Sequence, residues 1–313
     1  MRVPTLSPPA YRRVTLFALL ALTFIIVTGG AVRLTGSGLG CPDWPTCAEN
    51  RVVAPLEYHA MVEFVNRTIT GLVSVAVMMA VLGSLVRRPR RKDLLWLSIG
   101  LVAGVIGQIV LGGLTVLFEL KPGFVMAHFL LSMVLLANAV VLHHRAGRPV
   151  GPTRPAVSTD LLALGRLAVA AAALVIFLGT IVTSSGPHGG DEDAERLPFL
   201  LPDVTRLHGI AVTLFLAVTL VVLWRLRRAG VDRGILRRSE VLLAVVVAQG
   251  ALGYIQYFTG VPALLVGFHI AGATAVWVAA LRLHLAFSVP AARPGGEADG
   301  DSVEPWSAAL SST

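Results

Sequence analysis

The sequence predicts an all-α, polytopic membrane protein with eight transmembrane helices arranged as two four-helix bundles. Three observations support this fold class. The chain of 313 residues is 55% hydrophobic and only 14% charged, whereas soluble domains carry about 25% charged residues. The apolar residues gather in long runs, and a helix of about 20 such residues crosses a bilayer core. The chain also repeats a polar motif in its second half.

Eight apolar runs are long enough to span a membrane. They occupy residues 14–34, 61–86, 94–118, 123–144, 160–185, 202–226, 239–258 and 262–287. The first run lacks the small-residue cleavage pattern of a signal peptide, so we interpret it as a retained span. No transit-peptide pattern precedes it, which favours a bacterial plasma membrane as the location.

The distribution of charge predicts the orientation. The net charge is +8, but the basic residues collect in short loops on alternate sides of the spans, which indicates membrane topology and not nucleic-acid binding. The positive-inside rule places the loops around residues 87–92, 145–154 and 225–238 in the cytoplasm, together with both termini. Residues 289–313 are rich in Pro, Gly, Ser and acidic residues, which predicts a disordered cytoplasmic tail.

A motif shared by the third and seventh runs indicates an internal repeat. Gln108 and Gln249 each open a Gln-x-x-Leu-Gly pattern, and each precedes a histidine, His128 or His269, by 20 residues. Repeats of this kind define the architecture before any single motif is interpreted.

The repeat divides the chain into an N-terminal half, residues 1–150, and a C-terminal half, residues 151–288. Each half contains four runs. Because four is even, the two copies have the same orientation and are related by an axis along the membrane normal. Ligand sites are then expected inside the bundles or between them.

Histidines near the outer ends of the even-numbered runs are the first candidate ligands. His208 and His269 lie at a similar depth on two runs, so they are suited to be the two axial ligands of a heme iron. Hydrogen-bonded interior histidines are the alternative; a zinc site would need further ligands. In the N-terminal half His128 matches His269, but Asn66 stands where His208 has its counterpart.

A polar stripe on the second run is the candidate reaction site. His59, Glu63 and Asn66 fall on one helical face. His59 could replace the missing ligand or cap the site. Glu63 could move a proton or stabilise positive charge as a catalytic carboxylate, or it could form an ion pair with Arg67 one turn away.

Three arginines and two cysteines lie near the outer face. Arg33, Arg67 and Arg206 are suited to bind heme propionates, although anchoring at the membrane interface is the alternative. Cys41 and Cys47 are the only cysteines of the sequence. In an outer loop they can form a disulfide, which could be structural or redox-active.

Taken together, these motifs resemble those of the heme A synthase family. The resemblance covers residues 11–287. The stretch 36–45, Gly-Ser-Gly-Leu-Gly-Cys-Pro-Asp-Trp-Pro, is its most specific part; the other carriers are Glu63-x-x-Asn66-Arg67, Ala127-His128, Gly186-Pro187-His188, Arg206-x-His208 and His269.

The resemblance implies a heme b between His208 and His269 and a site for heme O in the N-terminal half, with Glu63 as the catalytic residue. The implied reaction oxidises a methyl group of heme O to the formyl group of heme A, which terminal oxidases use. Implied partners are heme O synthase, an electron carrier, the lipid bilayer, and the terminal oxidase or its assembly factors.

One residue departs from the family pattern, which is Glu-x-x-His-Arg. Asn66 occupies the position of that histidine. The resemblance then implies that the substrate heme is held by His128 alone or by His128 and His59. The alternative function is a di-heme electron carrier of cytochrome b type. It is weakened by Asn66, because a carrier would use two histidines in both halves.

Overall fold

The computed structural model describes residues 5–49 and 51–291. Within these residues the chain forms eight long helices and two short strands. The elements are α1 Pro8–Leu34, α2 Tyr58–Val86, α3 Lys92–Leu117, α4 Pro122–Ala146, β1 Thr153–Pro155, α5 Thr159–Ser185, α6 Leu201–Arg228, α7 Arg233–Phe258, α8 Ala263–Ala286 and β2 Ser288–Pro290. All eight helices are long and apolar enough to cross a membrane, which confirms the predicted spans.

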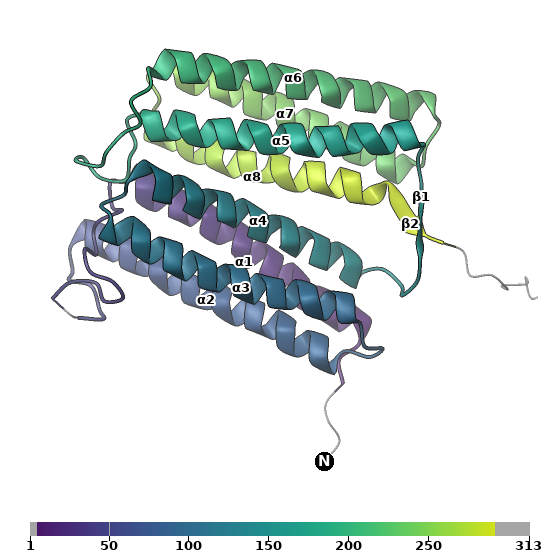
Figure 1. Cartoon of the computed structure of the whole chain (residues 1–313), viewed down its shortest axis with the longest axis horizontal. Coiled ribbons are helices and arrows are strands. Elements are labelled where there is room, and N and C mark those ends of the chain that lie inside the picture. The colour runs from purple at the N-terminus through teal and green to yellow at the C-terminus, as the bar shows by residue number, and fades with distance from the viewer. Residues whose placement is uncertain (1–4, 50, 292–313) are drawn as a thin grey trace, which may run out of the picture.

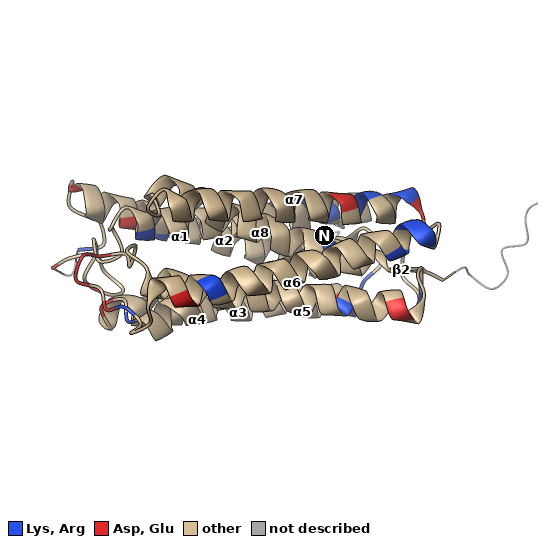
Figure 2. Ribbon diagram, turned by 90° about the horizontal axis from the view of Figure 1, so that it is seen from above, with Lys and Arg blue, Asp and Glu red and all other residues tan. Residues whose placement is uncertain are grey.

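Several helices begin before the apolar runs that predicted them. Helix α1 begins at Pro8, and the side chain of Ser7 accepts a hydrogen bond from the backbone N–H of Ala10, a pattern typical of a helix N-terminus. Helix α7 begins at Arg233 with Asp232 as its N-cap. Its first turns carry several arginines, so hydropathy alone predicts a start near residue 239. Charged residues lie toward the ends of the helices and leave the middle apolar (Figure 2).

Each half of the chain forms a closed ring of four neighbouring helices. Helix α1 contacts α2 and α4, and α3 contacts α2 and α4; in the second half α5 contacts α6 and α8, and α7 contacts the same two helices. The halves lie side by side and meet where α8 packs against α1 and α4, with α4 also touching α5 (Figure 1). The contacts therefore follow the same cycle in both halves.

The interface between the halves is tightly packed. The indole N–H of the buried Trp277 on α8 donates to the carbonyl oxygen of Met133 on α4 at 2.9 Å. A Cβ at Gly30 on α1 would lie 3.0 Å from Ile270 Cδ1 on α8. Small residues at such positions let membrane helices approach closely, so Gly30 sets the distance between α1 and α8.

The structure corrects the predicted tail at its first residues. Strand β2 pairs antiparallel with β1, with Val289 opposite Arg154, and the N–H of Ala291 donates to the carbonyl oxygen of Pro152. Backbone pairing of this kind carries no hydropathy signal, so it could not be predicted from the sequence. The rest of the predicted tail, residues 292–313, lies outside the described residues.

Both ends of the described chain lie at one end of the molecule. Near the first described residues, the N–H of Leu6 donates to the carbonyl oxygen of Val86 at the end of α2, and β2 lies beside the α4–α5 connection (Figure 1). The long α1–α2 and α5–α6 loops lie at the opposite end. This agrees with an even number of spans; that the shared end is cytoplasmic stays a prediction from the arginine distribution.

Candidate functional site

A large cavity beneath the long loops collects most of the predicted site residues. Its volume is ≈ 1330 Å³, above the about 300–1,000 Å³ of a typical small-molecule pocket. Both halves of the chain line it. The predicted residues on its wall are Arg33, Glu63, Asn66, Arg67, His128, Arg206, His208 and His269.

The structure brings His208 and His269 together across the second half of this cavity. Their ring centroids are 6.5 Å apart with an interplanar angle of 65°. Metal–imidazole nitrogen bonds are about 2 Å long, so rings on opposite sides of one metal ion have centroids about 6 Å apart. The spacing of this pair therefore fits two axial ligands of a single iron.

Two glycines make room for these histidine rings. A Cβ added at Gly179 on α5 would lie 3.3 Å from His208 Cε1, and one at Gly253 on α7 would lie 3.1 Å from His269 Cε1. The Nδ1 atoms of both histidines are buried and have no hydrogen-bond partner among the described residues. Each ring is thus held against a neighbouring helix by packing, in a cradle that a larger side chain would fill.

The repeated glutamines fix the helices that carry two of the histidines. Gln249 Nε2 donates to the carbonyl oxygen of His269 at 2.7 Å, and Gln108 Nε2 donates to that of His128 at 3.1 Å. A Cβ at Gly112 would lie 3.4 Å from His128 Cε1. The Gln-x-x-Leu-Gly motif therefore supplies one hydrogen bond and one ring cradle in each half. The sequence showed the repeat but not this role.

Among the described residues of the first half, His128 is the one histidine on the cavity wall. Asn66 lines the cavity, and its Oδ1 is buried with no partner in the described part of the chain. His59 is exposed and does not line the cavity; its Nδ1 lies 2.9 Å from Ser37 Oγ in the α1–α2 loop. Helix α2 already includes His59, so the chain does not fold back there. The geometry favours the capping interpretation of His59.

Glu63 and Arg67 form an ion pair that holds the cysteine loop, residues 36–48. Glu63 Oε1 accepts from Arg67 Nη2 at 2.6 Å and from Nε at 3.1 Å, while its Oε2 accepts from the backbone N–H of Cys41 at 2.8 Å. Both side chains are largely buried, with 8% and 20% exposure. The pairing that the sequence left as an alternative is therefore present, and the Glu63 carboxylate also borders the cavity.

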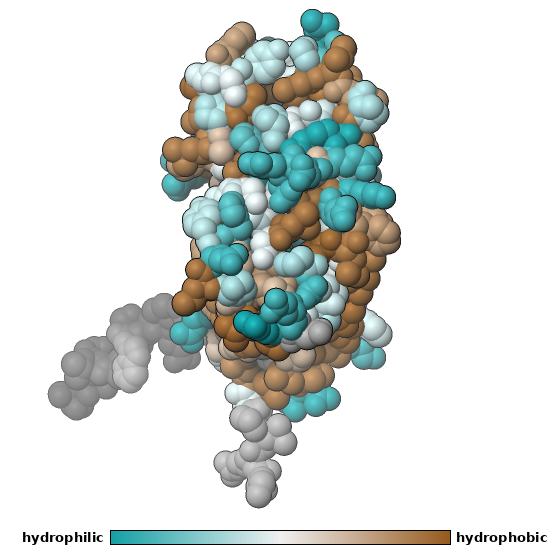
Figure 3. Space-filling model, turned by 90° about the vertical axis from the view of Figure 1, so that its left-hand side faces the viewer, coloured by the Kyte–Doolittle hydropathy of each residue, from teal (hydrophilic) through white to brown (hydrophobic). Residues whose placement is uncertain are grey.

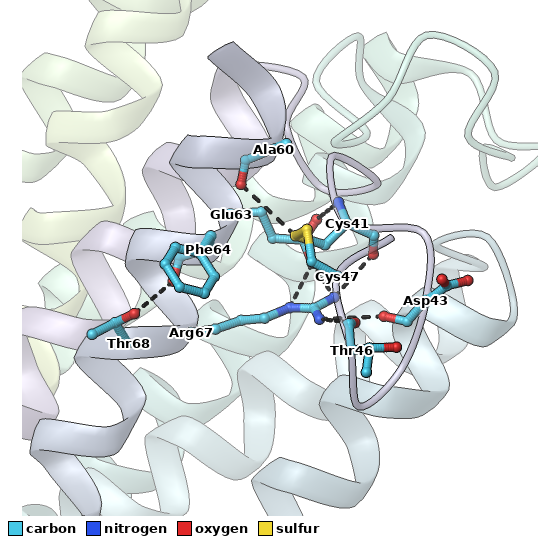
Figure 4. Close-up of a disulfide and its surroundings, with 9 residues drawn as sticks. All are labelled: Cys41, Asp43, Thr46, Cys47, Ala60, Glu63, Phe64, Arg67 and Thr68. Atoms are coloured by element: carbon cyan, nitrogen blue, oxygen red, sulfur yellow. Dashed lines mark hydrogen bonds and ion pairs between the residues drawn. A yellow bond between two sulfur atoms is a disulfide. The ribbon is translucent and has the colours of Figure 1, made fainter. Parts of the chain in front are cut away.

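All the N–H donors of Arg67 are engaged by the protein. Nε makes one bond, Nη1 donates to the carbonyl oxygens of Asp43 and Thr46, and Nη2 donates to Glu63 and to the carbonyl oxygen of Cys41 (Figure 4). A propionate contact by Arg67 stays a prediction, and it would require one of these bonds to be exchanged. The predicted disulfide between Cys41 and Cys47 is present in the same loop.

Trp44 closes the cysteine loop over the first half of the cavity, which it lines. A Cβ at Gly113 on α3 would lie 2.6 Å from Trp44 Nε1, and the Arg67 guanidinium lies 5.2 Å from the centroid of the indole ring. Trp44 was visible in the sequence only as part of a motif. Its contact with Gly113 depends on the folded loop, which no sequence spacing revealed.

Arg33 joins the two halves at the end of the molecule that carries the long loops. Its Nε donates to the carbonyl oxygen of His188 at 2.6 Å, and its Nη2 donates to that of Thr183 at 3.0 Å. The N–H of Gly38 donates to the carbonyl oxygen of Gly190 at 2.7 Å. These bonds tie the α5–α6 loop to α1. Figure 3 shows this end of the molecule, with hydrophilic side chains concentrated across its middle and apolar side chains along its edges.

Arg206 is the most exposed of the three arginines. Its side chain is 76% exposed and lies 3.9 Å from Asp203, so its charge stays open to solvent at the rim of the cavity. A propionate contact by Arg206 stays a prediction.

Comparison with known proteins places these features in a family. Residues 12–187, more than half of the chain, match the COX15-CtaA family, described as cytochrome oxidase assembly protein. The chain is 24% identical over 263 residues to a protein of Listeria welshimeri named heme A synthase, which covers 79% of this chain and 85% of that one. A heme A synthase of Listeria monocytogenes matches with the same identity and coverage.

A third relative is matched over a shorter segment. The chain is 30% identical over 128 residues to a heme A synthase of Geobacillus kaustophilus and spans 39% of that relative's length. The family match covers the first half from residue 12 onward and the beginning of the second, including the cysteine loop, Glu63 and His128. The chain therefore belongs to the COX15-CtaA family of cytochrome oxidase assembly proteins.

Proposed function

We propose that the chain is a heme A synthase, which oxidises a methyl group of heme O to the formyl group of heme A. The relatives of that name support the activity. The observation that carries the proposal is the asymmetry of the shared cavity. One half presents two histidines at 6.5 Å, and the other presents His128, Asn66 and a buried carboxylate, Glu63.

The second half is proposed to bind heme b through His208 and His269. The ring spacing and the glycine cradles support this ligand set. When bound, heme b supplies a one-electron redox centre. The Gln249 bond to the His269 carbonyl keeps α7 and α8 in register, and Arg33 fixes the loop above the site.

The first half is proposed to bind heme O as the substrate. His128 is its candidate iron ligand, since it is the one histidine of this half on the cavity wall within the described residues. Asn66, the departure from the family pattern, is a poor iron ligand but carries an unpaired Oδ1 that can accept a hydrogen bond from a bound molecule. Trp44 and Gly38 of the cysteine loop line this cavity.

Glu63 is proposed as the catalytic residue. Its carboxylate borders the cavity, while Arg67 and the Cys41 N–H fix its position. Oε2 accepts one hydrogen bond in the structure, so it retains a lone pair that can take a proton from the reacting group. A fixed negative charge can also stabilise positive charge that develops on the substrate.

The proposed reaction defines the partners by their chemistry. Heme O synthase supplies the substrate, an electron carrier exchanges electrons with the enzyme, and the terminal oxidase or its assembly factors receive heme A. Substrate and product are apolar porphyrins, so the surrounding bilayer is the solvent in which they are exchanged.

Heme extraction followed by chromatography tests the proposed function. The full-length chain is co-expressed with a heme O source, and the hemes are compared with those of the same host without the chain. We expect heme A only when both are present. Two b-type hemes per chain and no modified porphyrin would contradict the proposal and would favour the di-heme carrier.

A further inference from the structure

A second cavity lies at the opposite end of the molecule from the candidate site. Its volume is ≈ 400 Å³, and it is lined by Arg148 from the α4–α5 connection, Arg154 from β1 and Arg238 from α7. We call these three residues the basic pocket. The volume falls in the range of about 300–1,000 Å³ that small-molecule sites occupy.

The charges of the basic pocket are not neutralised by carboxylates of the described residues. Other arginines at this end of the molecule form ion pairs, such as Arg91 with Asp93 and Arg227 with Glu240. None of the three pocket arginines has a carboxylate within 4.0 Å in the described part of the chain. The pocket therefore has an excess of positive charge.

One acidic residue, Asp232, also lines the pocket. Its Oδ1 accepts from the backbone N–H of Gly234 at 2.7 Å as the N-cap of α7, so this carboxylate is engaged by the helix end. The pKa of Arg148 is below its ordinary value because the residue is partly buried and because Arg238 is near. The guanidinium groups thus repel one another, and an anion between them relieves that repulsion.

The surroundings of the basic pocket are those of a lipid headgroup. Ile235, Ala286 and Val289 form an apolar wall beside the arginines. The pocket lies where α4 and α8 end and α7 begins, beside the β1–β2 pair, at the end that the positive-inside rule assigns to the cytoplasm. Anionic lipids of the cytoplasmic leaflet attract such clusters, and forked arginine donors match phosphate oxygens.

We propose that the basic pocket binds the phosphate group of an anionic membrane lipid. The site is separate from the heme cavity, so it does not depend on the proposed enzymatic activity. A free phosphate shares the same chemistry, and the membrane position favours the lipid.

Native mass spectrometry of the purified full-length chain tests this inference. The protein is titrated with phosphatidylglycerol and, separately, with phosphatidylcholine. We expect the anionic lipid to bind at least about tenfold more tightly, because arginines near the headgroup favour negative charge. Equal binding of both lipids would overturn the proposal. So would complete displacement of phosphatidylglycerol by millimolar inorganic phosphate, which would identify a free anion as the ligand.

Two matched variants assign the binding to the pocket. The triple variant Arg148→Gln, Arg154→Gln, Arg238→Gln should lose the preference for phosphatidylglycerol. A control with the same change in charge replaces Arg88, Arg90 and Arg237, which do not line the pocket, and should keep it. Loss of the preference in both triple variants, or in neither, would overturn the assignment.

A single substitution keeps the test valid if the triple variant of the basic pocket misfolds. Arg154 is exposed and lies on β1, so Arg154→Gln removes one charge without a packing defect. We expect this variant to weaken phosphatidylglycerol binding about fivefold at an unchanged melting temperature. Unchanged lipid binding would count against the pocket.

Discussion

The loop ends of the two halves differ although their helices follow the same cycle of contacts. In the first half the disulfide and the Glu63–Arg67 pair hold the cysteine loop, residues 36–48. In the second half Arg33 of the other half donates to one carbonyl of the α5–α6 loop and to one at the end of α5, and Arg196 of the loop itself donates to two further loop carbonyls. The first half therefore holds its loop with a disulfide and a buried ion pair, whereas the loop of the second half is held by arginine bonds to backbone carbonyls, one arginine coming from the other half.

The deeper parts of the two halves remain alike. Gln108 and Gln249 make the same bond to a histidine carbonyl, and a glycine faces each ring. Within the helices the main differences are Asn66 in place of His208 and Glu63 on the cavity wall. The two halves therefore share one cycle of helix contacts and one set of glutamine and glycine supports, and they differ in their loops and in these cavity residues.

Removing the charge of Glu63 should have the largest effect. General acid–base groups contribute typically 10²–10⁴-fold, so Glu63→Gln should lower heme A formation about 1,000-fold while heme b stays bound. The amide can still accept the bond from the Cys41 N–H, and mass spectrometry of the intact disulfide checks the loop. Glu57→Gln, at an exposed acid that precedes α2, is the control. Normal turnover in Glu63→Gln would leave Glu63 as a loop anchor only.

The loss of Arg67 should be the next largest effect. Arg67→Ala leaves the buried Glu63 carboxylate and three loop carbonyls without their donor, and breaking a buried pair costs about 3 kcal/mol or more. Arg206→Ala, which removes an exposed side chain, should change stability by less than about 0.5 kcal/mol. Thermal unfolding of both variants in one detergent measures the difference. Equal melting temperatures would contradict the loop-holding role of Arg67.

Opening the disulfide should cost less. Cys41 and Cys47 are separated by six positions, and closing so short a loop contributes about 2 kcal/mol. Because Arg67 still binds the loop carbonyls, the double Cys→Ser variant should keep most of its turnover at a lower melting temperature. An unchanged melting temperature with lost turnover would instead indicate a redox-active pair.

Filling the glycine cradle beside the His269 ring should have the smallest of these effects. Gly253→Val crowds the His269 ring, because even its Cβ would lie 3.1 Å from Cε1, so it should reduce the heme b content about tenfold, the lower end of the range expected for residues that orient a ligand. Gly71→Val introduces the same side chain on α2, where nothing lies within 4 Å of an added Cβ. Absorbance of the bound heme per protein compares the two. Equal heme content would show that Gly253 does not position the ring.

The spans and most of the cavity residues could be predicted from the sequence. Apolar runs report burial in lipid directly, and the 20-residue spacing of Gln108 and Gln249 from their histidines marked the repeat. The start of α7 at Arg233 and the β1–β2 pair could not, because charged first turns and short backbone pairings have no apolar pattern.

The contacts of the candidate site could be predicted only in part from the sequence. Glu63 and Arg67 were recognised as neighbours one helical turn apart, but the three loop carbonyls that share Arg67 depend on the path of the cysteine loop. The packing of Trp44 on Gly113 depends on the same path. Helical spacing fixes local neighbours, whereas contacts between a loop and a distant helix require the folded chain.

The heme content and product of two matched variants test the proposed division of labour most directly. His128 and His269 have equivalent surroundings, with a glycine beside each ring and a glutamine on each carbonyl. His269→Ala should lose the bound heme b. His128→Ala should keep heme b at the wild-type ratio and fail to form heme A when heme O is supplied. Loss of heme b from His128→Ala, or normal heme A formation by this variant, would contradict the proposal that the second half holds heme b and the first half carries out the reaction.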